Sequence, residues 1–173
     1  MDSQDPTAYA LGGDGSVTDP LYRRLNAWSN HGNMPLRMPF MTQVEDNLWH
    51  GGVETGLVLP DFIDHVVSLY PWEAYTAQHE PTSVLMVTMY DSLEQGFEQV
   101  DDIARWVNAA RKTGTVLVHC QAGLNRSSLV VARALMLSGE VESGQEAIDL
   151  LRRRRDPAVL CNPVFEEWIR AHD

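Results

Sequence analysis

Residues 115–128 read TVLVHCQAGLNRSS, and this stretch decides the fold. It opens with a continuous apolar run, residues 116–118, which is typical of a short strand buried on both faces. Residues 129–137 are apolar over the length of a helix. The polar loop between them, residues 120–126, is therefore expected at the carboxyl end of a strand and the positive end of a helix dipole. Backbone N–H groups in such a loop can converge on an anion.

Three side chains give this loop a chemistry beyond anion binding. A thiol, Cys120, opens it, Arg126 stands six positions later, and the hydroxyl of Ser127 follows directly. The N–H groups, the helix dipole and the arginine should lower the pKa of the thiol from ~8.5 into the roughly 3.5 to 7.5 range of activated cysteines. The loop thus predicts Cys120 as a nucleophile, Arg126 as a phosphate clamp and Ser127 as a hydrogen-bond donor to the sulfur. An N-cap role for the following helix is the other interpretation of Ser127, and both roles can hold together.

Residues 119–127 resemble a known signature, His-Cys-x-x-Gly-x-x-Arg-Ser/Thr, of the cysteine-dependent protein tyrosine phosphatases. The resemblance is strongest to the dual-specificity branch and covers roughly residues 44–170. It implies that His119 orders the loop by hydrogen bonding rather than acting as a base. It also implies that phosphate is bound by Gln121, Ala122, Gly123, Leu124, Asn125 and Arg126.

Asp91 is the candidate general acid, 29 residues before the cysteine. It follows an apolar run, where the dual-specificity family carries its catalytic aspartate, and the same carboxylate could later activate water. An ordinary aspartate at the end of a strand or at a helix cap is the other interpretation. Glu94 and the pair Asp101/Asp102 are weaker candidates, because the pair should lie on the solvated face of a helix.

Strands alternate with helices along the chain. Strands are expected at residues 47–50, 65–70, 84–90 and 115–119. Helices are expected at residues 97–110, 129–138, 143–155 and 162–169. This order predicts an α/β fold with a central, largely parallel sheet of about four or five strands flanked by helices, in agreement with the dual-specificity phosphatase fold. Ligands of such sheets bind at the carboxyl ends of the strands, where Asp91 and Cys120 should meet.

The chain divides into an N-terminal extension, residues 1–42, and a phosphatase catalytic domain, residues 43–173. The extension should be partly flexible, because residues 12–15 read GGDG. The helical spacing of Leu21, Tyr22, Leu25 and Trp28 predicts one short helix that docks on the domain. Simple packing is the favoured role of this segment, and a cover over the active site is the alternative.

Composition narrows the function classes. The net charge of −11 argues against nucleic acid or an anionic membrane as a general partner. The sequence has no apolar run near ~18 residues, so no membrane insertion is expected. The two cysteines, Cys120 and Cys161, show no metal-binding spacing, and a reactive thiol suits a reducing compartment, so a cytoplasmic enzyme without metal or cofactor is expected. The oligomeric state stays open.

Two further features each allow two interpretations, and a third concerns specificity. Cys161 is either a small buried hydrophobic residue or a redox partner of Cys120. The run Arg152–Arg155 either complements the dipole at a helix end or docks phosphate. Asn125 stands where many dual-specificity phosphatases have serine, and Arg133 also departs from the family pattern, so both could tune specificity.

Together these features predict a protein phosphatase that hydrolyses phosphotyrosine through a cysteinyl-phosphate intermediate, with phosphoserine and phosphothreonine as further possible substrates. Its partner would be a phosphorylated protein. The alternatives are a phosphoinositide phosphatase, an RNA 5′-phosphatase, a sulfur- or arsenate-transfer enzyme, and a pseudophosphatase that only binds phosphate. A highly charged inositol headgroup is disfavoured because the 120–126 loop contains no lysine.

Overall fold

The computed structural model describes residues 17–29 and 31–172, so the predicted flexible stretch 12–15 lies outside the described residues. A hairpin comes first, formed by β1 (Arg24–Trp28) and β2 (Pro35–Pro39). The strands of the main sheet are β3 (Met41–Glu45), β4 (Leu48–Gly51), β5 (His65–Ser68), β6 (Ser83–Met86) and β7 (Val116–His119). The helices are α2 (Val100–Arg111), α3 (Arg126–Ser138), α4 (Gly144–Arg154) and α5 (Pro163–Ala171).

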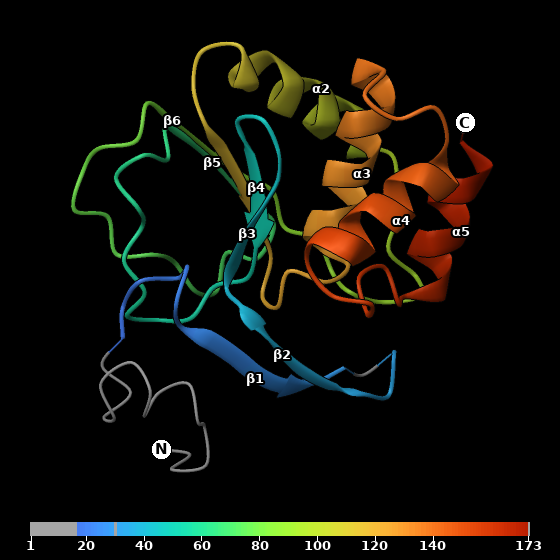
Figure 1. Ribbon diagram of the computed structural model, residues 1–173. Coiled ribbons are helices and arrows are strands. Elements are labelled where there is room, and N and C mark those ends of the chain that lie inside the picture. Colours follow the sequence, from blue (N-terminus) through green and yellow to red (C-terminus); the bar gives the residue numbers. More distant parts are fainter. Residues whose placement is uncertain (1–16, 30, 173) are drawn as a thin grey trace.

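The main sheet has five strands in the order β3-β4-β7-β5-β6. Strands β4, β7, β5 and β6 are parallel, and only β3 runs antiparallel, against β4. The helices lie on one side of this sheet and loops on the other (Figure 1). The predicted α/β fold with a largely parallel sheet of four or five strands is confirmed.

The central strand β7 is buried on both faces, as its apolar run predicts. Val116 and Val118 belong to the large core cluster that includes the helices, whereas Leu117 packs in a second cluster on the other face. All three side chains have no exposed surface. The alternation of β-strand side chains explains how one short strand supports two cores.

The predicted starts of α4 and α5 and the predicted end of α3 are confirmed by their caps, whereas α2 begins at Val100 and not at residue 97. The Ser143 hydroxyl accepts a hydrogen bond of 3.1 Å from the Glu146 N–H, which starts α4. The Asn162 side chain accepts from the Val164 N–H at 3.1 Å, with proline as the next residue. Helix α3 ends at Gly139, whose φ of 78° favours glycine.

Two predictions about strands need correction. The strand expected at residues 84–90 is not buried: β6 ends at Met86 and forms an edge of the sheet, where Val84 is 56% and Met86 58% exposed. An apolar run cannot distinguish a central strand from an edge strand, because the number of neighbouring strands is set by the tertiary fold and not by the local sequence: β6 pairs only with β5. Strand β3 was not predicted at all. The predicted domain boundary, between residues 42 and 43, lies inside this strand. The division into domains stays a prediction.

The docking helix expected at residues 21–28 is also wrong, because this segment forms β1, which pairs antiparallel with β2. Tyr22 and Trp28 are each 58% exposed, so the helical spacing does not mark a buried face. The deciding signal lies in β2, where Leu36 and Met38 alternate with exposed residues and pack into the core.

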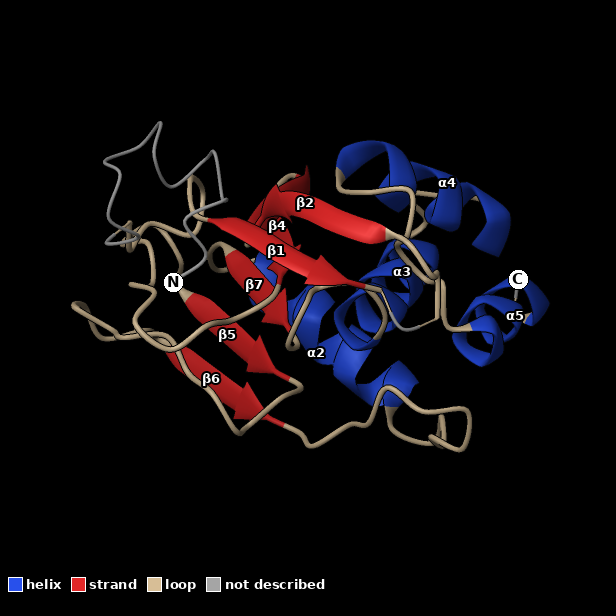
Figure 2. Ribbon diagram, turned by 90° about the horizontal axis from the view of Figure 1, so that it is seen from below, coloured by secondary structure: helices blue, strands red, loops and turns tan. Residues whose placement is uncertain are grey.

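The hairpin lies beneath the main sheet in Figure 1 and in front of β4 and β7 in Figure 2. Its second strand leads directly into β3, and the Phe40 carbonyl accepts a 2.8 Å hydrogen bond from the Gly52 N–H after β4. The hairpin is thereby fixed near the carboxyl ends of the parallel strands. Among the described helices none is long and apolar enough to cross a membrane.

Candidate active site

The 120–126 loop turns its backbone carbonyl groups outward. The Gln121 carbonyl accepts from the Val53 N–H at 2.9 Å, and the Leu124 carbonyl from the Leu160 N–H at 2.8 Å. Arg155 holds the two carbonyl groups between them. Because C=O and N–H point in opposite directions across a trans peptide, the N–H groups of four successive peptides, residues 122–125, turn to the inner side of the loop. This arrangement is an anion-binding nest.

Arg155 is the residue that fixes the middle of the loop. Its guanidinium donates to the Gly123 carbonyl at 2.8 Å and to the Ala122 carbonyl at 2.9 Å. It also donates to the Pro39 carbonyl at 2.8 Å and to the Thr42 hydroxyl at 2.9 Å. Burial lowers the pKa of Arg155 to about 10, so that the side chain remains charged at neutral pH. The loop, the end of the hairpin and β3 are thus joined by one side chain.

The Cys120 sulfur lies inside this nest. Sγ accepts from the Gly123 N–H at 3.3 Å and lies 3.4 Å from the Ser127 hydroxyl. Burial alone would raise the pKa of the thiol, but the charge of Arg126 and the hydrogen bonds from Ser127 and Gly123 together hold it below its ordinary value. The geometry therefore favours a thiolate, the reactive form of cysteine.

Arg126 is a buried arginine with an unused donor. The residue is 8% exposed, its Nη1 donates to the Met89 carbonyl at 3.1 Å, and its guanidinium lies 5.1 Å above the ring of Tyr70. Its Nε has no partner among the residues that the structure describes. A buried donor without a partner is costly, and a bound oxyanion would supply the missing acceptor.

Gly123 is required by the geometry of the loop. Its φ is 70°, in the left-handed region. A Cβ atom at this position would lie 2.4 Å from the Gly51 carbonyl carbon and 2.7 Å from Arg155 Nη2. Glycine therefore allows the loop to approach both β4 and the arginine.

Asp91 lies in the connection 87–99 between β6 and α2, not at the end of a strand. Its Oδ2 accepts from the Asn125 amide at 3.0 Å and its Oδ1 from the Asn162 amide at 2.9 Å. His31 Nε2 lies 3.2 Å from Oδ1. Asp91 and Cys120 line the same pocket, so the predicted acid and nucleophile are brought together.

His119 is fully enclosed behind the loop. Its Nδ1 lies 3.1 Å from the Cys120 carbonyl, and burial lowers its pKa to about 4. The ring packs edge-on against Tyr75, with 5.4 Å between the ring centroids. The imidazole is thus neutral at pH 7 and directed at the backbone, an arrangement that suits an ordering role more than that of a base.

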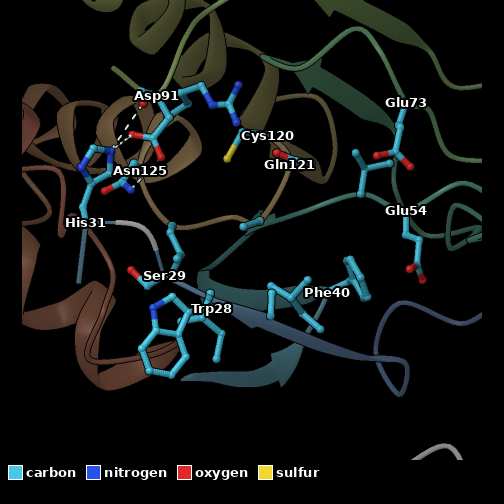
Figure 3. A pocket seen from close by; sticks show the side chains of 17 residues that line it. Trp28, Ser29, His31, Phe40, Glu54, Glu73, Asp91, Cys120, Gln121 and Asn125 are labelled. Atoms are coloured by element: carbon cyan, nitrogen blue, oxygen red, sulfur yellow. Dashed lines mark hydrogen bonds and ion pairs between the residues drawn. The ribbon is translucent and has the colours of Figure 1, made fainter. Parts of the chain in front are cut away.

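The pocket has a volume of about 390 Å³ and opens between the loop and the hairpin (Figure 3). Cys120, Arg126 and Asn125 line it on the side of the loop. Trp28 and Phe40 line it on the side of the hairpin. Side chains from both parts of the chain therefore line the pocket that contains the sulfur.

Residues 63–173 match the family model of the dual specificity phosphatase catalytic domain. The chain belongs to this family. The match includes the whole 120–126 loop and Asp91, so the resemblance of the 119–127 signature to dual-specificity phosphatases is confirmed. The hairpin lies before the matched residues.

Two curated relatives share part of the sequence of this chain. MAP kinase phosphatase with leucine-rich repeats protein 3 of Dictyostelium discoideum is 36% identical over 84 residues, which are 49% of this chain and 9% of that protein. Dual specificity protein phosphatase 19 of Mus musculus is 39% identical over 64 residues, 37% of this chain and 28% of that protein. The aligned segments thus span less than a third of either relative.

Solved structures of dual specificity phosphatases share the fold. The crystal structure of human DUSP28 aligns with a TM-score of 0.63 and 17% identity, over 77% of this chain and 94% of that chain. The crystal structure of DUSP15 aligns with a TM-score of 0.62 and 20% identity, over 76% and 85% of the two chains.

Sequence reasoning missed two residues of this candidate site, Arg155 and His31. Neither interpretation of the run Arg152–Arg155 describes Arg155, because its side chain is buried behind the loop. Arg152 bonds to the Val159 carbonyl at 2.9 Å and to Glu166. Cys161 is half-buried and a free thiol like Cys120, and its redox role stays a prediction.

Proposed function

We propose that the domain hydrolyses phosphotyrosine in protein substrates through a cysteinyl-phosphate intermediate. The Cys120 thiolate attacks phosphorus, and the bond from phosphorus to the tyrosine oxygen breaks. That oxygen leaves with a proton from Asp91. The N–H groups of the loop and the Arg126 guanidinium hold the three remaining oxygens.

The second step releases inorganic phosphate. Asp91, now a carboxylate, takes a proton from water, the water oxygen attacks phosphorus, and the sulfur leaves as a thiolate. A hydrogen bond from Ser127 stabilises that thiolate, since the two side chains already lie 3.4 Å apart. No metal ion takes part in either step of this mechanism.

One observation carries the proposal: a thiol with a lowered pKa sits in a nest of backbone N–H groups beside a buried arginine with an unused donor. Sulfur or arsenate transfer would not need the acid Asp91 in the same pocket. The pocket walls also favour an aryl phosphate, because Trp28, Ala27 and the half-buried Leu25 offer apolar surface beside the polar loop.

The proposal extends to the domain division, the partner and the location of the protein. Residues 43–173 would form the catalytic domain and residues 1–42 an extension that contributes the hairpin. The partner would be a phosphorylated protein. Nucleic acid is not expected as a partner, given the net charge of −11. A cytoplasmic location stays a prediction.

The test is phosphate release in the presence of EDTA from matched phosphotyrosine and phosphothreonine peptides, a phosphoinositide and an RNA 5′-triphosphate. Wild type should prefer the phosphotyrosine peptide by at least about tenfold in kcat/KM, because only an aryl group fills the apolar walls. Cys120→Ser supplies the background rate, and Cys161→Ser is the matched cysteine control that should stay active.

A faster reaction with phosphoinositide or RNA would replace the proposed substrate class. Tight phosphopeptide binding without release would point to a pseudophosphatase. Loss of release with EDTA would contradict the metal-independent mechanism.

A further inference from the structure

The hairpin brings a histidine to the candidate acid from a part of the chain that precedes the family match. Strands β1 and β2 lie within residues 24–39, whereas the match begins at residue 63. His31 lies in the turn between the two strands, and in Figure 3 it stands on the opposite side of Asp91 from Cys120. Its Nε2 is 3.2 Å from Asp91 Oδ1.

The turn is anchored, so the position of His31 is defined. Ser29 is 3% exposed, and its hydroxyl accepts a 2.8 Å hydrogen bond from the Gly32 N–H. The same hydroxyl lies 3.3 Å from the sulfur of Cys161, the residue before Asn162. His31 and Asn162 therefore approach Asp91 from two segments that contact each other.

The orientation of the two amide groups around Asp91 is fixed by their other ends. Asn125 Oδ1 accepts from the Asn162 N–H at 2.9 Å, and Asn162 Oδ1 accepts from the Val164 N–H at 3.1 Å. Both NH₂ groups must then face the carboxyl group of Asp91, where they lie 2.9 and 3.0 Å from its oxygens. Both amides are thus donors to Asp91.

His31 adds a third donor. Its Nε2 lies 3.4 Å from the backbone carbonyl of Asp91 as well as 3.2 Å from Oδ1. A carbonyl oxygen only accepts, so the tautomer with hydrogen on Nε2 satisfies both contacts. Oδ1 then accepts from His31 and Asn162, whereas Oδ2 accepts from Asn125 alone. Only Oδ2 keeps a free lone pair for a proton.

We propose that His31 is a positioning residue that occupies Oδ1 of Asp91 and so places the acid proton on Oδ2. A protonated carboxyl group fits this arrangement, because its carbonyl oxygen accepts two hydrogen bonds and its hydroxyl oxygen accepts one. Since Asp91 sits in a connection without regular secondary structure, these contacts hold the acid in place. The inference rests on the proposed phosphatase function and extends the active site to the hairpin.

The test compares two substrates that differ in their need for an acid. Phosphotyrosine leaves as a phenol of pKa about 10, whereas dinitrophenyl phosphate releases an anion that needs no proton. His31→Ala should lower kcat/KM for phosphotyrosine about tenfold, part of the roughly 10²–10⁴ that general acid catalysis supplies, and leave that for dinitrophenyl phosphate unchanged. His31→Gln, which can donate from a similar position, should stay within about threefold of wild type.

Two controls make the result specific. Arg37→Ala changes an exposed residue of β2 outside the pocket and should leave both substrates unaffected. In an Asp91→Asn background, His31→Ala should cause no further loss, because the histidine acts through the missing acid.

Equal losses with both substrates, a loss that persists in the Asp91→Asn background, or full activity of His31→Ala would each overturn the inference while the phosphatase function stands. Wild-type protein without Cys120-dependent activity on either substrate would overturn the proposed function and the inference together. If the His31→Ala protein unfolds, His31→Gln provides the test, because the glutamine amide keeps a hydrogen-bond donor at this position.

Discussion

Replacing Arg155 by methionine should lower the free energy of unfolding by roughly 2–4 kcal/mol and kcat/KM at least about 100-fold. The change leaves the carbonyl groups of Pro39, Ala122 and Gly123 without their donor, and each buried unpaired group costs about 1–3 kcal/mol. Methionine also removes the desolvation penalty of the buried guanidinium, and this offsets part of that cost. Activity falls because Arg155 no longer fixes the orientation of these loop peptides, so their N–H groups are no longer held toward the inner side of the loop.

Urea unfolding and steady-state kinetics at a temperature where both proteins are folded would measure the two effects. Arg154→Met is the matched control, because Arg154 is the exposed neighbour in the same run. It should lie within about 0.5 kcal/mol of wild type. An Arg155→Met protein with wild-type activity would show that the loop holds its shape without the clamp.

Replacing Arg126 by lysine should lower kcat by about 10²–10³. Lysine keeps the positive charge but loses the planar fork, so it cannot reach the Met89 carbonyl and two phosphate oxygens together. Stability should change little in comparison, because the unused Nε is removed with the fork.

The measurement is kcat on phosphotyrosine with saturating substrate, with Arg105→Lys as a control on the exposed side of α2. A kcat within about tenfold of wild type would mean that the N–H groups stabilise the transition state without a bidentate arginine.

The sequence predicted the centre of the site because that centre is local. A strand, a six-residue connection and a helix follow one another along the chain, and Cys120 and Arg126 come together through this connection itself. The prediction of Asp91 depended on the family resemblance, because the whole of α2 separates Asp91 from the loop along the chain. Its amide partners Asn125 and Asn162 meet it only through tertiary packing.

The inward orientation of Arg155 could have been predicted from the helical periodicity of the sequence. Four consecutive arginines look alike, but Arg155 follows Leu151 by four residues and Ile148 by seven, the spacing of one helical face. Ile148 and Leu151 are fully buried, so the last arginine had to turn inward and find partners. Its four hydrogen-bond partners all lie more than 30 residues away in sequence, so the local sequence could not identify them.

The hairpin could not be predicted from the local sequence, for a different reason. Leu21, Leu25 and Trp28 satisfy helical spacing, yet the segment becomes a strand because β2 offers it a partner with a buried alternate face. The contact between His31 and Asp91 joins residues 60 positions apart. Only the assembled fold reveals that a residue outside the family match reaches the candidate acid Asp91.

The central claim is that Cys120 carries the phosphoryl group during turnover. The direct measurement is mass spectrometry of protein denatured rapidly while it hydrolyses a phosphotyrosine substrate. One phosphoryl group on the peptide that contains Cys120, absent from Cys120→Ser and from wild type without substrate, is the predicted result. Steady phosphate release by wild type with Cys120 unmodified throughout, under conditions that preserve a thiophosphate, would contradict the account.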